Sequence, residues 1–167
     1  MIFLDFKTGK WQKPSRVYVN SIEDMPKERM GASMVYFDDR LWVYSGADPY
    51  GTGAVYSDFY SFNLTSGLWK RDSSFSELNN SSGNLLGQAV RIYNSNAVIF
   101  SGGCQIESQQ CSFGVTKSIL FGQPNAHFND IAINADEFEG RMGHSVVQLG
   151  EAVLSFGGCS FGKQCTS

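Results

Sequence analysis

A repeat of about 56 residues constrains the fold of this chain more than any other feature of its sequence. The segment Arg29–Ser33 reads Arg-Met-Gly-Ala-Ser, and Arg141–Ser145 reads Arg-Met-Gly-His-Ser. Leu85–Ala89, which lies midway between them, keeps the glycine but lacks the arginine. A chain of this kind stacks equivalent units, so the structure of one unit decides the architecture.

Each unit is predicted to begin with a β-hairpin. Short runs rich in β-branched and aromatic residues flank a polar turn in the segments 34–44, 89–100 and 146–156. The first unit adds a second hairpin at 58–70, and the opening segment 2–11 repeats that second hairpin. A low content of charged residues (17%) and 18 glycines agree with a strand-rich chain of tight turns. The sequence therefore predicts an all-β fold of four-stranded antiparallel sheets.

The order of motifs within a unit resembles the kelch repeat, the unit of kelch β-propellers. It comprises Arg-x-Gly-His-Ser at 141–145, a hydrophobic hairpin, Gly-Gly at 157–158, an aromatic strand after Asp58, and Ser-Gly-Leu-Trp at 66–69. The resemblance covers nearly the whole chain and is specific in the first and third units. The middle unit lacks the arginine, the histidine and a tryptophan after 118–121. The resemblance implies a β-propeller with kelch-type four-stranded blades.

The chain then divides into a half blade (1–13), a blade (29–83), a blade (84–140) and a second half blade (141–167). These segments amount to about three blades, whereas propellers typically have four to eight. We therefore expect the chain to be part of a larger propeller. The alternative is that two copies close one six-bladed ring.

Two cysteine pairs occupy equivalent loops of the repeat. Cys104 directly follows one Gly-Gly pair and is separated from Cys111 by six residues, and Cys159 directly follows the next and is separated from Cys165 by five. Loops this short bring their ends within disulfide reach, so we predict the bonds Cys104–Cys111 and Cys159–Cys165. Reduced, buried cysteines are one alternative. A zinc site is another, although the spacings exceed the usual two to four residues, and we predict no metal.

The predicted disulfides indicate an oxidising compartment. Glycosylation sequons begin at Asn63, Asn79 and Asn80 and point the same way. We therefore expect an extracellular or lumenal glycoprotein, with the cytoplasm as the alternative. No apolar run approaches the roughly 18 residues that a membrane-spanning helix needs. The net charge of −3, without a cluster of Lys and Arg, argues against nucleic acid as a partner.

Kelch propellers generally serve as protein-interaction platforms, so the resemblance implies a non-catalytic binding module without a cofactor. In that family, loops from successive blades emerge on one face. The candidate partner-binding residues on these loops are Arg29, Tyr50, Ile106, Arg141 and Phe161. The two arginines have a second interpretation, as motif residues bonded to neighbouring backbone carbonyls.

Two other functions remain open. The chain could be an architectural component of a large assembly, which the sequence does not separate from a binding module. It could also derive from an oxidase-type propeller enzyme, since copper radical oxidases resemble kelch propellers. Those enzymes use several His and Tyr ligands, whereas this chain has only His127 and His144. His144 stands in the repeat motif, where we expect a structural role.

Overall fold

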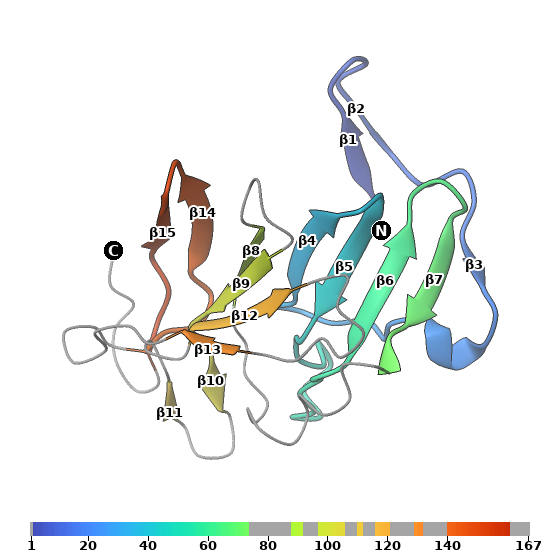
Figure 1. Ribbon diagram of the computed structural model, residues 1–167. Helices are drawn as coiled ribbons and strands as arrows, with labels where there is room; N and C mark the ends of the chain where they lie inside the picture. The colour runs from blue at the N-terminus through green and yellow to red at the C-terminus, as the bar shows by residue number, and fades with distance from the viewer. Residues whose placement is uncertain are drawn as a thin grey trace.

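The computed structural model describes residues 2–73, 88–91, 97–105, 110–111, 116–120, 129–131 and 140–160. These residues form mainly β-strands, as the sequence predicts (Figure 1). A single turn of 3-10 helix, η1 (Ile22–Asp24), is capped by Ser21, whose hydroxyl oxygen accepts a hydrogen bond from the Glu23 N–H.

The first large sheet has five strands in the order β3-β7-β6-β5-β4. Its members are β3 (Tyr18–Val19), β4 (Ser33–Phe37), β5 (Arg40–Tyr44), β6 (Phe59–Asn63) and β7 (Leu68–Arg71). Strands β4 to β7 form the antiparallel meander expected for the first unit. No sequence pattern indicates β3, which pairs with β7 in parallel at the outer edge.

The second large sheet has four antiparallel strands in the order β13-β12-β9-β8. They are β8 (Gln88–Arg91), β9 (Ala97–Ser101), β12 (Thr116–Leu120) and β13 (Asn129–Ile131). The middle unit thus forms the same meander as the first, although its outer half carries a weaker sequence pattern.

Three separate hairpins complete the described structure. They are β1 (Phe3–Asp5) with β2 (Lys10–Gln12), β10 (Cys104–Gln105) with β11 (Gln110–Cys111), and β14 (Ser145–Leu149) with β15 (Ala152–Phe156). The β1–β2 hairpin projects beyond the first sheet in Figure 1.

The first strands of the three units lie side by side. Strand β4 contacts β8, and β8 contacts β14 (Figure 1). The later strands of each large sheet lie progressively farther from this row, because each sheet is a simple meander.

The core of the first sheet includes an aromatic cluster. Tyr60, Phe62 and Trp69 form a buried cluster on one face, and Leu41 and Val43 pack against it. The Phe62 and Trp69 rings lie 5.0 Å apart, at a distance where aromatic pairs attract each other.

Gly67 allows the segment that precedes β3 to pack closely against the turn between β6 and β7. Gly67 has φ +71°, and a Cβ there would stand 2.6 Å from the carbonyl oxygen of Arg16. The Gly67 carbonyl in turn accepts a hydrogen bond from the Tyr18 N–H (2.8 Å). The glycine of the Ser-Gly-Leu-Trp motif therefore allows both a left-handed turn and a close approach of two backbones.

Candidate functional site

Arg29 lies just before β4, and its side chain joins three segments of the first unit. The side chain is 6% exposed. Its Nη1 donates to the carbonyl oxygen of Ser45 (2.9 Å) and to the carboxylate of Asp58 (2.6 Å). The guanidinium also lies over the rings of Tyr56 (4.7 Å) and Tyr60 (5.4 Å). These contacts fix the loop that follows β5 to the start of β6.

Arg141 makes the equivalent backbone contact in the third unit. Its Nη1 donates to the carbonyl oxygen of Gly157 at 2.9 Å, at the same sequence separation as Arg29 and Ser45. Both arginines, named above as candidate binding residues, thus bond to a backbone carbonyl within their own unit. A contact of either one with a partner stays a prediction.

The residues after the two arginines also pair alike. Met30 exchanges two backbone hydrogen bonds of 2.9 Å with Ala47, and Met142 exchanges two of 2.9 Å with Cys159. The sequence repeat is therefore a repeat of contacts, even where side chains differ.

Tyr50 stands at the tip of the loop that follows β5, and its side chain is 76% exposed. The carboxylate of Asp48 fixes this loop by accepting hydrogen bonds from the backbone N–H groups of Tyr50 (3.2 Å) and Thr52 (3.0 Å) and from the Thr52 hydroxyl (2.8 Å). These bonds, led by that of the Thr52 N–H, hold the pKa of Asp48 below its ordinary value. The Tyr50 ring is therefore both exposed and held on an ordered turn.

The hydroxyl of Tyr50 donates to the carboxylate of Glu28. This hydrogen bond, together with the negative charge of Glu28, raises the pKa of Tyr50 above its ordinary value. The phenol is consequently neutral at physiological pH and can act as a hydrogen-bond donor. The contact also connects the loop to the segment that precedes β4.

A groove of about 590 Å³, which we call the η1 groove, is lined in part by Glu28, the hydrogen-bond partner of the Tyr50 hydroxyl. Its walls come from the segment between β3 and β4 and from β6, β7 and the residues before β6. The lining residues are Ile22, Glu23, Met25, Pro26, Lys27, Glu28, Tyr56, Asp58, Tyr60 and Arg71. The groove thus combines an apolar and aromatic surface with charges of both signs.

Two exposed apolar side chains stand on the wall that η1 forms. Ile22 is 82% exposed and Met25 is 46% exposed. The wall is fixed to the first sheet, because the carboxylate of Asp24 accepts a hydrogen bond from the Arg71 N–H (3.0 Å). The repeat did not indicate this part of the site, since residues 14–28 belong to none of the repeated units.

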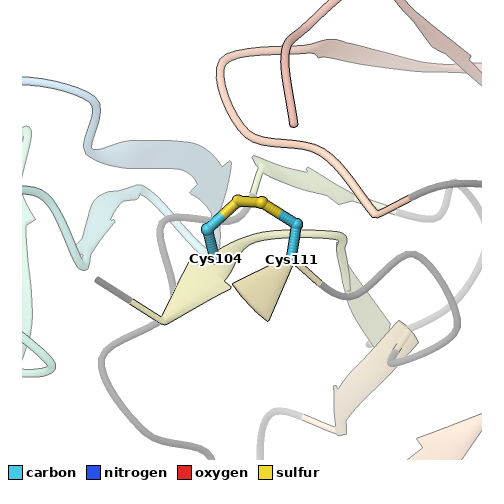
Figure 2. The surroundings of a disulfide bond; sticks show 2 residues. All are labelled: Cys104 and Cys111. Carbon is cyan, nitrogen blue, oxygen red and sulfur yellow. A yellow bond between two sulfur atoms is a disulfide. The ribbon is translucent and has the colours of Figure 1, made fainter. Parts of the chain in front are cut away.

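The disulfide predicted between Cys104 and Cys111 is confirmed (Figure 2). The two residues stand directly opposite each other on β10 and β11, with their Cα atoms 4.0 Å apart. Cys159 is also disulfide-bonded, and its expected partner Cys165 lies outside the described residues.

Five other residues named from the sequence lie outside the described part of the chain: Ile106, Phe161, Asn79, Asn80 and His127. Asn63, the remaining sequon residue, is at the end of β6 and is half-buried. Its side-chain oxygen accepts hydrogen bonds from the Ser66 N–H (2.7 Å) and the Ser66 hydroxyl (3.0 Å). Its glycosylation stays a prediction.

His144 lies at the junction of the second and third units and is 2% exposed. A Cβ on Gly102 of the second unit would stand 2.7 Å from its Cε1 atom. The Gly103 N–H donates to the Arg141 carbonyl across the same junction (2.9 Å). Burial lowers the pKa of His144, because desolvation disfavours the imidazolium, and the charge of Arg141 acts in the same direction.

Within the residues that the structure describes, no three His, Cys, Asp or Glu side chains gather as a metal site would require. The same residues contain no helix that is long and apolar enough to span a membrane. No model of a known protein family matches the chain, and none of the curated proteins compared with it matches either.

Proposed function

We propose that this chain contributes blades to a kelch-type β-propeller and binds a protein partner, without catalysis, through the loop face around the η1 groove. The adjacency of β4, β8 and β14 supports the propeller, because first strands that line a common axis are its defining arrangement. The matching contacts of Arg29 and Arg141 support the assignment of kelch units.

Tyr50 is the observation that carries the binding role. A 76% exposed aromatic ring on a loop held by Asp48 loses little conformational freedom when a partner covers it. Tyrosine is enriched among the residues that dominate binding energy at protein interfaces. Its neutral hydroxyl adds a polar contact at the end of an apolar ring.

The η1 groove supplies a surface that complements this anchor. Apolar side chains of Ile22 and Met25 lie next to charged groups such as Lys27 and Glu28. An apolar centre with a polar rim is the usual composition of a protein–protein interface. The expected partner therefore offers an apolar side chain to the groove and a hydrogen-bond donor to the Tyr50 hydroxyl oxygen, whose own hydrogen is donated to Glu28.

The disulfide between Cys104 and Cys111 supports an oxidising compartment. We therefore propose that the chain acts in an extracellular or lumenal protein. A glycan on Asn63, which is half-buried at a turn, is a further part of this proposal.

The binding role is tested by capture of proteins from conditioned medium with the immobilised chain. Tyr50→Ala should reduce the amount of captured partner by roughly 30-fold, the loss that accompanies removal of an interface hot spot. Tyr18→Ala is the matched control, because this tyrosine is 50% exposed but stands on β3 at the outer edge of the first sheet and not on the loop after β5.

Two results would contradict the proposal. One is recovery of the same proteins in equal amounts by wild type, Tyr50→Ala and Ile22→Asp. The other is capture of no protein above the level of a denatured control. Thermal melting of each variant verifies that the fold is retained, as expected for exposed side chains.

A further inference from the structure

Equivalent positions of the repeat differ sharply in exposure between the first and third units. Val35 on β4 is 9% exposed, whereas Val147, its equivalent on β14, is 58% exposed. Tyr44 at the end of β5 is 5% exposed, whereas Phe156 at the end of β15 is 71% exposed. The second sheet lies against β4, and no described strand lies beyond β14 in the same direction. The outer face of the β14–β15 hairpin is therefore an apolar surface without a cover.

Strand β4 lies at the opposite end of the row of sheets, and there the exposed residues lie on the other face of the strand. Met34 and Tyr36 project from the other face of β4 and are 59% and 49% exposed. Their equivalents on β14, Val146 and Gln148, are half-buried on the side from which β8 contacts β14. The face of β4 that would meet a preceding sheet is thus exposed.

The β1–β2 hairpin is the outer half of a sheet. Leu4 stands opposite Trp11, as Phe62 stands opposite Trp69 on β6 and β7. The neighbouring pair, Phe3 with Gln12, repeats the pair of Ser61 with Lys70 in the same register. Among the described residues, β1 pairs only with β2.

The β14–β15 hairpin is the corresponding inner half. Gln148 stands opposite Val153, as Tyr36 stands opposite Leu41 on β4 and β5. Among the described strands, β15 pairs only with β14, whereas β5 pairs with both β4 and β6. One chain therefore carries an inner half-sheet and an outer half-sheet that are not joined to each other.

We propose that a second copy of this chain joins these halves. The β15 strand of one copy pairs antiparallel with β1 of the other, and a sheet in the order β14-β15-β1-β2 results. The register of β5 with β6, in which Leu41 stands opposite Phe62, places Val153 of one copy opposite Leu4 of the second copy. The uncovered face of β14–β15 then packs against Met34 and Tyr36 of the second copy.

A second copy fits this position because the exposed face of β14–β15 and the exposed face of β4 are both apolar, and the inner and outer half-sheets complement each other. A two-fold axis repeats the junction, so each copy provides one inner half and one outer half. Two unpaired strand edges per copy are removed. The apolar surface around Val147 and Phe156 is covered by a surface of the same character. This inference rests on the proposed stacking of the sheets and not on the partner-binding role.

Covalent cross-linking tests the predicted register. Leu4→Cys combined with Val153→Cys should form an interchain disulfide, visible as a dimer on a non-reducing gel. The control pair is Trp11→Cys with Val153→Cys, because Trp11 lies on β2, one strand farther from β15. Two strand spacings amount to about 10 Å, which is beyond disulfide reach, so the control should form no interchain disulfide and run as a monomer on that gel.

The oligomeric state tests the interface itself. Native mass spectrometry of the chain at about 10 μM should give twice the mass of one 18.4 kDa chain. Val147→Asp with Leu154→Asp should raise the dissociation constant of the dimer by roughly 30-fold or more. Both side chains are exposed in a single copy, at 58% and 48%, so the variant should still fold. Ile22→Asp, at an exposed site away from this face, should leave the dimer intact.

A monomer at this concentration would overturn the proposal, as would a dimer that survives the paired aspartates without forming the Leu4–Val153 cross-link. The chain would be monomeric in this experiment if further residues of a longer polypeptide, or a different protein, covered the same face. Tyr50→Ala should dimerise as wild type does, so failure of dimerisation is distinguishable from failure of partner capture.

Discussion

Replacement of Arg29 by methionine should destabilise the chain more than any exposed substitution. Methionine keeps the apolar part of the side chain, which packs close to Gly46. It removes the donor to the Ser45 carbonyl and to the Asp58 carboxylate. It also removes the cation that lies over Tyr56.

The expected magnitude follows from burial. The side chains of Arg29 and Asp58 are 6% and 17% exposed, so the carboxylate left behind is largely removed from water. Breaking a buried ion pair from one side costs about 3–5 kcal/mol, and the residual exposure of Asp58 places this case near 3 kcal/mol. At about 2–4 °C per kcal/mol for a chain of this size, the melting temperature should fall by roughly 6–12 °C.

Urea unfolding followed by tryptophan fluorescence measures the free energy of unfolding directly. Lys70→Met is the matched control, because Lys70 is exposed on β7 of the same sheet, and it should change the free energy by less than about 0.5 kcal/mol. The double variant with Asp58→Asn should be less destabilised than the sum of the single variants. A loss below about 1 kcal/mol for Arg29→Met would refute a structural role for the guanidinium.

Three further predictions concern the junctions and loops. Replacing Cys104 and Cys111 by alanine should cost about 2 kcal/mol, measured by calorimetry without reductant. Gly102→Ala should cost more than Gly150→Ala in urea unfolding, because both have positive φ but only the first Cβ would meet another unit. The lowered pKa of His144 predicts full stability above about pH 6.5 and a loss of stability as the pH falls below it, since the unfolded chain takes up the proton first. His144→Gln should flatten that slope in thermal melts.

Much of the strand arrangement could be predicted because it depends on sequence patterns within single hairpins and loops. The hairpin β4–β5 follows from two short apolar runs around Asp38 and Asp39, which adopt positive φ at the turn. The Cys104–Cys111 bond follows from a short loop after a Gly-Gly pair. Each of these features depends on residues that are close in sequence.

The features that sequence reasoning missed depend on distant residues. Strand β3 is only two residues long, and it exists because Tyr18 reaches the Gly67 carbonyl. Asp58 could not be assigned to Arg29 without knowing how the loop after β5 folds back. Val35 and Val147 occupy one position of the repeat, and only the presence of a neighbouring sheet decides which of them is buried.

A crystal structure of the chain would test most directly whether its sheets stack as propeller blades. We expect β4, β8 and β14 to stand side by side around one axis, with Tyr50 and the η1 groove on the loop face. A sandwich in which the two large sheets pack with β4 and β8 at separate edges would contradict it.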